Sequence, residues 1–119
     1  MSEQIKISVY EVVGSGLCVA SDDGQKVYDR IAAALREGRK VKLSFLNVDS
    51  LTSAFLNAAI GQLYSEFKEE EIKSNLTVSE MVQDDLALLK RVVETAKEYF
   101  KDPERLFAAR REAVGDNDD

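Results

Sequence analysis

Apolar and polar positions alternate at the start of the chain, and the alternation predicts a first β-strand. Ile5, Ile7 and Val9 are separated by polar residues, so one face of this strand is buried. Gly14-Ser15-Gly16 interrupts the pattern, and an apolar run follows at 17–19. Because glycine adopts the positive φ of tight turns, we predict a β-hairpin. A phosphate-binding glycine loop is the alternative, but it needs a helix directly after the glycines.

The spacing of the apolar residues then changes to that of a helix, which starts near Ser21 and stops at Gly38. Asp22 and Gln25 have the spacing of a capping box, and Asp22 and Asp23 lie at the favourable end of the helix dipole. A divalent-cation site at the two aspartates is the alternative reading. The buried stripe comprises Val27, Ile31, Ala34 and Leu35.

A further strand is predicted over 41–46, with Val41, Leu43 and Phe45 on one face. Leu46 and Val48 extend its burial, which is typical of a central strand covered on both faces near its end. A helix over about 53–67 follows. Its core stripe repeats at spacings of four, three and four residues and comprises Leu56, Ile60, Leu63 and Phe67.

The last part of the chain predicts a short strand at 72–76, a capping box at Thr77–Glu80 and a long helix. The stripe of this helix comprises Val82, Leu86, Leu89, Val93, Ala96 and Phe100. A short helix over 102–114 and a disordered acidic tail over 115–119 complete the chain. We therefore predict one α/β domain over 1–101, a mixed four- to five-stranded sheet with an N-terminal hairpin, flanked by three main helices.

Composition excludes several classes of chemistry. The chain has no histidine and a single cysteine, Cys18, so a His-based triad, a His-ligated zinc site and an internal disulfide are ruled out. The net charge of −6 disfavours nucleic acid as a partner. No run approaches the ~20 apolar residues of a membrane span, and the start lacks a signal-peptide pattern. We expect a cytoplasmic protein without metal or cofactor.

The loop from Asn47 to Ser53 is the one concentrated polar site in the sequence. It follows the predicted central strand, where open α/β sheets bind ligands, and its hydroxyl residues open the next helix. Ser50, Thr52 and Ser53 would lie at the electropositive end of that helix, which suits a phosphate or a partner's acidic group. The simpler interpretation is capping alone, with Thr52 or Ser50 as the N-cap.

Small residues form a second face on the same helix. They recur at spacings of four, three and four residues and comprise Ala54, Ala58, Gly61 and Ser65. Such a face allows another backbone to approach closely, so it packs either on the protein's own sheet and helices or on a partner.

The segment Phe45–Leu63, above all Thr52-Ser53-Ala54-Phe55 and Gly61, resembles the central signature of the bacterial STAS-like family of unknown function. This family is related to the STAS domains of anti-sigma-factor antagonists. The resemblance implies a STAS-like domain over 1–101 and a regulatory role. In antagonists the serine that opens this helix is phosphorylated by an anti-sigma kinase, and it corresponds to Ser53. Antagonists usually have Asp where this chain has Thr52, and Gly where it has Phe55.

We therefore expect a non-catalytic module that binds a protein, such as an anti-sigma factor or a histidine-kinase-like ATPase, and is switched by phosphorylation of Ser53. The predicted contact residues are Asp49, Ser50, Thr52, Ser53, Ala54, Asn57, Ala58 and Gly61. One alternative is a small-ligand or enzymatic site at Asn47, Asp49, Ser50 and Thr52. Another is a structural subunit that self-associates through the long helix ending near Phe100. The oligomeric state stays open.

Overall fold

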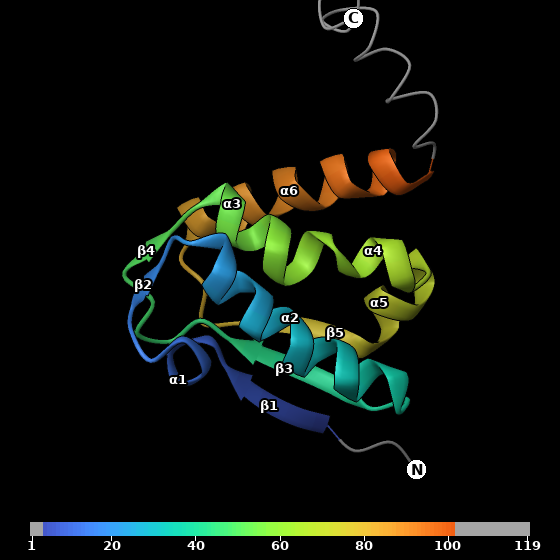
Figure 1. The fold of residues 1–119 in the computed structure, drawn as a ribbon, viewed down its shortest axis with the longest axis horizontal. Helices are drawn as coiled ribbons and strands as arrows, with labels where there is room; N and C mark the ends of the chain where they lie inside the picture. The colour runs from blue at the N-terminus through green and yellow to red at the C-terminus, as the bar shows by residue number, and fades with distance from the viewer. Residues whose placement is uncertain (1–3, 102–119) are drawn as a thin grey trace, which may run out of the picture.

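The computed structural model describes residues 4–101 and shows an α/β domain with five short strands and a layer of helices (Figure 1). The first half of the chain forms β1 (Gln4–Ser8), α1 (Val9–Val13), β2 (Leu17–Cys18), α2 (Ser21–Arg36), β3 (Lys40–Ser44) and β4 (Ser50–Leu51). The second half forms α3 (Ser53–Leu56), the π-helix η1 (Asn57–Gly61), α4 (Leu63–Glu66), α5 (Glu69–Asn75), β5 (Leu76–Ser79) and α6 (Gln83–Lys101). The predicted helix at 102–114 and tail at 115–119 lie outside the described residues.

The main sheet has three strands in the order β1-β3-β5, and both pairings are parallel. The predicted strand at 41–46 is thus confirmed as the central one. Val41 and Leu43 are fully buried under the helices, whereas Lys40 and Lys42 point to the other face and are exposed. This alternation is what the two-residue period of a strand requires.

The helices form one thick layer above the apolar face of this sheet. α3, η1 and α4 follow one another without a break and are called here the 53–66 segment. α2 packs on β1 and β3 and on the 53–66 segment, and α6 covers that segment on its other side (Figure 1). The predicted core stripes of α2 and of the 53–66 segment are buried throughout, as expected from their helical spacing.

The predicted N-terminal hairpin is wrong. After β1 the chain forms α1, because Ser8 Oγ accepts a hydrogen bond from the Glu11 N–H and caps the first turn. Gly14 ends this helix with φ of +85°. β2 then pairs in parallel with β4, not with β1. The glycines therefore end a helix and precede a strand. The predicted mixed sheet is also wrong: within residues 4–101 the five strands form a three-stranded and a two-stranded sheet, and every pairing is parallel.

The strand predicted at 72–76 is also wrong, because most of that range belongs to α5. Three glutamates at 69–71 occupy the first turn of α5, where acidic side chains favour a helix, and Ile72 is buried on its inner face. The third strand starts at Leu76 instead. Thr77–Ser79 therefore pair with β3 and do not form a capping box.

Two further local predictions fail. The N-cap of α2 is Ala20, which has no side-chain hydrogen bond, and Gln25 instead donates to Asp29. Asp22 and Asp23 do lie in the first turn, as predicted for the dipole. Leu46 is 52% exposed and does not extend the burial of β3.

The buried stripe of α6 differs from the prediction at its start. Val82 lies before the helix and is 65% exposed, and Leu86 is 39% exposed. Leu89, Val92 and Ala96 carry the contact with the core. The first turn of α6 therefore extends beyond the core.

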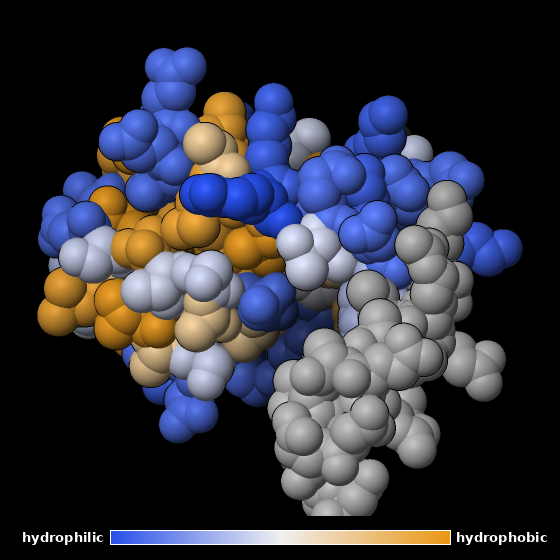
Figure 2. All heavy atoms as spheres, turned by 90° about the horizontal axis from the view of Figure 1, so that it is seen from above, coloured by the Kyte–Doolittle hydropathy of each residue, from blue (hydrophilic) through white to orange (hydrophobic). Residues whose placement is uncertain are grey.

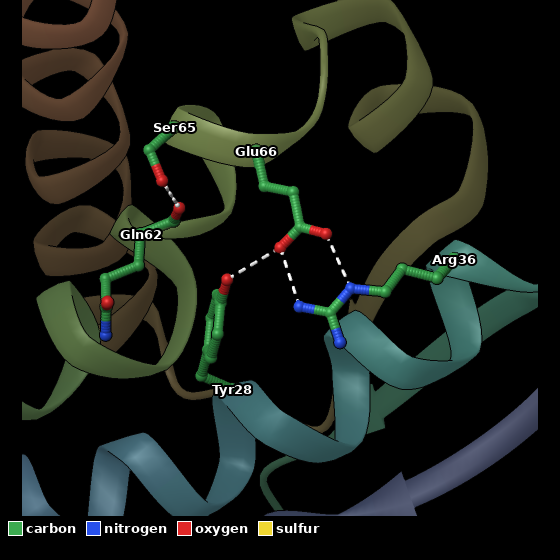
Figure 3. A network of polar contacts seen from close by, with 5 residues as sticks. All are labelled: Tyr28, Arg36, Gln62, Ser65 and Glu66. Atoms are coloured by element: carbon green, nitrogen blue, oxygen red, sulfur yellow. Dashed lines mark hydrogen bonds and ion pairs between the residues drawn. The ribbon is translucent and has the colours of Figure 1, made fainter.

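A polar network joins α2 to α4 on the surface (Figure 3). The Glu66 carboxylate accepts hydrogen bonds from Arg36 Nε, from Arg36 Nη2 at 2.8 Å and from the Tyr28 hydroxyl at 2.9 Å. The pKa of Glu66 is lowered, first by the hydrogen bonds from Arg36 and then by the one from Tyr28. Nearby, Ser65 Oγ donates to the Gln62 carbonyl at 2.7 Å. The network fixes the end of the 53–66 segment to α2.

We expect Glu66→Gln to make stability less dependent on pH. A carboxyl group whose pKa is lower in the folded state stabilises the fold above its unfolded pKa, and loses that effect as pH falls through the folded pKa. The wild type should therefore be more stable than Glu66→Gln at neutral pH, and the difference should shrink as pH falls below the unfolded pKa of about 4.3 and through the lower folded pKa. Urea unfolding at several pH values measures this.

Glu37→Gln is the matched control, because Glu37 pairs with Arg39 two residues away and joins no second element. It should change stability little at any pH. A Glu66→Gln deficit of equal size at neutral and acid pH would mean that packing, not charge, is responsible.

Candidate functional site

The loop between β3 and α3 is held against the glycine turn that precedes β2. Asn47 turns the chain with φ of +70°. The Asp49 and Ser50 N–H groups both donate to the Gly16 carbonyl, at 2.8 and 3.1 Å. A Cβ at Gly16 would lie 2.6 Å from Asp49 Oδ2 and 2.7 Å from the Asn47 carbonyl oxygen. Gly16 is thus required by this close approach, a role that sequence analysis missed.

Thr52 is the N-cap of the 53–66 segment, as the simpler interpretation of the loop predicts. Its Oγ1 accepts from the Phe55 N–H at 3.2 Å and donates to the Val19 carbonyl at 2.7 Å. Its own N–H donates to the Cys18 carbonyl at 3.3 Å. The Thr52 hydroxyl therefore caps the helix and ties it to the residue that follows β2.

Ser53 is the first residue of α3 and is exposed to solvent. The N–H groups of a first helical turn have no acceptor within the helix, and they lie at the positive end of its dipole. Asp49 and Ser50 are exposed beside it in the preceding loop. The structure therefore places these three predicted residues at one accessible edge of the domain.

The small-residue face does not form one surface. Ala54 is exposed, whereas Ala58 is half-buried where α2 approaches, because a Cβ at Gly24 would lie 2.9 Å from Ala58 Cβ. Gly61 is buried beside Val92 and Ala96 of α6. The prediction that Gly61 belongs to an exposed contact surface is therefore wrong, because Gly61 packs inside the domain. Ala58 also packs partly inside the domain.

The predicted helix contains a π-turn that sequence analysis missed. The Gln62 N–H donates to the Asn57 carbonyl at 3.0 Å, five residues back, within the described π-helix 57–61. Asn57 itself is exposed. π-turns add one residue to a helix and are frequent at functional sites, but the apolar spacing carries no signal for them.

Four cavities of 320 to 530 Å³ were found in the described residues, and none of these four is lined by Asp49, Ser50, Thr52 or Ser53. The exposed edge at Ser53 is thus not one of these hollows. Asn47 lines a cavity of 340 Å³ at the end of β1 and β3. None of these four cavities therefore joins the four residues of the alternative small-ligand site.

Cys18 is fully buried in β2, and burial, with smaller effects from Asp23 and Asp49, raises the pKa of its thiol to about 11. Within residues 4–101 no group of three or more acidic or cysteine side chains is placed to hold a metal ion. Among the described helices, none combines the length and the hydrophobicity needed to cross a bilayer.

Large apolar side chains are exposed around the same end of the molecule. Leu17 opens β2 and Val19 follows it, while Val82 precedes α6 and Leu86 lies in its first turn. Their exposed fractions are 58, 43, 65 and 39%. In Figure 2 hydrophobic residues gather over the left of this face, the end at which β2, β4, α3 and the start of α6 lie in Figure 1. This cluster lies on the same end of the domain as Ser53.

Comparison with known proteins places this chain in a family. Residues 23–86, which are 64 of the 119 residues, match the family described as the STAS-like domain of unknown function (DUF4325). No curated protein and no solved structure matches the chain. The matched range includes α2 from its third residue on, the central strand, the hydroxyl loop and the whole 53–66 segment. The chain therefore belongs to this STAS-like family.

Proposed function

We propose that this protein is a regulatory module that binds a protein partner through the edge formed by Asp49, Ser50, Ser53, Ala54 and Asn57. All five residues are exposed and come from one loop and the helix that it opens. The observation that carries the proposal is the exposure of Ser53 at the first position of a helix capped by another residue, Thr52. The capping requirement is already met, so the Ser53 hydroxyl is available for another role.

The exposed apolar cluster favours a protein over a small ligand at this edge. Leu17, Val19, Val82 and Leu86 have large exposed fractions at the same end of the domain (Figure 2). Protein interfaces combine apolar residues of this kind with a polar rim, whereas small-molecule sites are concave. The edge around Ser53 belongs to none of the four cavities.

Phosphorylation of Ser53 is the proposed switch. A phosphoryl group there would meet the backbone N–H groups of the first helical turn and the positive end of the dipole. It would also add about −1.5 to −2 charges beside Asp49, and would thus repel an acidic partner surface. The proposed partner class is an anti-sigma factor or a histidine-kinase-like ATPase, since such an enzyme supplies the phosphoryl group from ATP.

The test compares partner recovery from the native host by the tagged wild-type chain, by Ser53→Glu and by Ala54→Arg. We expect both variants to lose most of the recovered partner, because each puts a charge or a long side chain at the centre of the edge. Mass spectrometry of the protein from the host should find one phosphoryl group at Ser53. Ala54 is preferable to Ala58 because Ala58 also contacts α2 near Gly24.

Ser74→Glu is the matched control, since Ser74 is exposed on α5, away from this edge. It makes the same change of side chain and charge and should leave recovery unchanged. Equal recovery by the wild type, Ser53→Glu and Ala54→Arg would contradict the proposed surface.

A further inference from the structure

Within residues 4–101, one face of the three-stranded sheet has no covering helix. Parallel sheets usually carry helices on both faces, but here the helices pack on the apolar face only (Figure 1). The register places polar side chains of neighbouring strands side by side on the other face, because paired residues point to the same side. The exposed residues of this face are Gln4, Lys6, Lys40, Lys42 and Thr77.

Two lysines of this face lie directly beside each other. Lys6 of β1 is in register with Lys42 of β3, and like charges at such positions repel. Within residues 4–101 neither lysine forms an ion pair. The chain as a whole has a net charge of −6. Two adjacent lysines that form no ion pair therefore make a local patch of positive charge on an acidic protein.

Three serines continue the same face to the carboxyl ends of the strands. Ser8, Ser44 and Ser79 are in register across β1, β3 and β5. Open α/β sheets bind ligands at this end of their strands. A cavity of 340 Å³ opens there, and its polar lining includes Lys6, Ser8 and Ser44. Hydroxyl donors and an ammonium group thus line one hollow.

One carboxylate of the protein already uses these donors. Glu80 accepts a hydrogen bond from Ser44 Oγ at 2.6 Å and one from Ser79 Oγ at 3.5 Å. Its backbone takes the uncommon φ of +59° directly after β5. The hydrogen bond from Ser44, followed by Lys6 and Lys42, lowers the pKa of Glu80. An anion is therefore stabilised where serine hydroxyls and two lysines converge.

We propose that this hollow binds the phosphate or carboxylate group of a small molecule, with Lys6, Ser8 and Ser44 as ligands and Lys42 beside them, and that Glu80 competes with it as an internal anion. The ligand's oxyanion replaces the Glu80 carboxylate at the Ser44 hydroxyl when Glu80 turns away. Glu11 also lines the cavity and reduces its positive potential, so affinity is modest. The site is independent of the edge around Ser53.

The test is an NMR titration of the ¹⁵N-labelled full chain at constant ionic strength, with inorganic phosphate in one arm and acetate in the other. Saturable shifts of the Ser8, Ser44 and Asn47 amides in either arm support the site, and the arm that saturates identifies the oxyanion. Glu80→Gln should tighten binding about fivefold, because it removes the competing charge. Lys42→Gln should weaken binding about fivefold.

Lys40→Gln is the matched control. Lys40 lies on the same strand and the same exposed face, but at the opposite end from the serines. It makes the same change of charge and should alter the Kd by less than about twofold. The proposal is overturned if neither anion saturates, if Glu80→Gln leaves the Kd unchanged, or if Lys40→Gln weakens binding as much as Lys42→Gln. The amide spectrum of each variant also reports whether it is folded.

Discussion

Replacing Phe55 with alanine should lower the free energy of unfolding by about 3–5 kcal/mol, the largest single effect that we expect in this chain. Phe55 has no exposed surface and is the largest of the fully buried side chains. It lies one turn after the Thr52 cap, so its ring anchors the start of the 53–66 segment in the core. Urea unfolding followed by circular dichroism measures the loss.

Leu17→Ala is the control. Leu17 is 58% exposed, so its replacement should lower the free energy of unfolding by less than about 0.5 kcal/mol. A total stability of about 5–15 kcal/mol is usual for a protein domain, so Phe55→Ala removes a large share of it. Phe55→Leu keeps most of the volume and should lose less than the alanine variant. Near-equal stability of the wild type and both Phe55 variants would contradict the anchoring role.

The second large effect is expected at Gly24, where α2 crosses the 53–66 segment. A Cβ at this position would lie 2.5 Å from the Phe55 carbonyl oxygen and 2.9 Å from Ala58 Cβ. The nearest atom belongs to the backbone and cannot rotate away, so the helices must separate. Gly24→Ala should therefore destabilise the protein by about 2 kcal/mol, although alanine alone favours a helix by about 0.5–1 kcal/mol. Thermal and urea unfolding measure the difference.

Gly61→Ala is the matched substitution on the other side of the same segment. A Cβ at Gly61 would lie 2.9 Å from Asn57 Oδ1, an atom of a side chain that can move. It would lie 3.7 Å from the nearest atoms of Val92 and Ala96 of α6. We therefore expect Gly61→Ala to be neutral, or to stabilise by up to about 1 kcal/mol. If both glycine variants lose the same stability, the close crossing at Gly24 is not the cause.

Local patterns predicted the buried stripes of this protein well. Val27 and Ile31 on α2, and Leu56 and Leu63 on the 53–66 segment, are buried as their spacing requires. Thr52 was identifiable as an N-cap because its hydroxyl bonds to an N–H three residues away. β3 was predicted as a strand from the alternation of Val41, Leu43 and Phe45 with polar residues, and its central place is confirmed. Each of these properties depends on neighbours within one or two helical turns or along one strand.

The errors concern segments whose form depends on distant partners. The residues after Ile7 are compatible with a strand, but Ser8 caps a helix and β2 pairs with β4, some thirty residues later. α5 replaces a predicted strand because Ile72 finds its burial in a helix that packs near the 53–66 segment. Short apolar runs do not distinguish a strand from a helix when the contacts that bury them are remote.

The candidate site shows the same division. The sequence by itself determined that a hydroxyl loop follows the central strand and opens a helix, since strand, cap and helix are local. Only the tertiary structure decided which small residues face outward, since Ala58 faces α2 and Gly61 faces α6. It also decided that Lys6 lies beside Lys42. The physical reason is that the spacing of apolar residues indicates which side of an element is buried. Strand register and the close approach of two backbones are instead set by contacts between segments far apart in the chain.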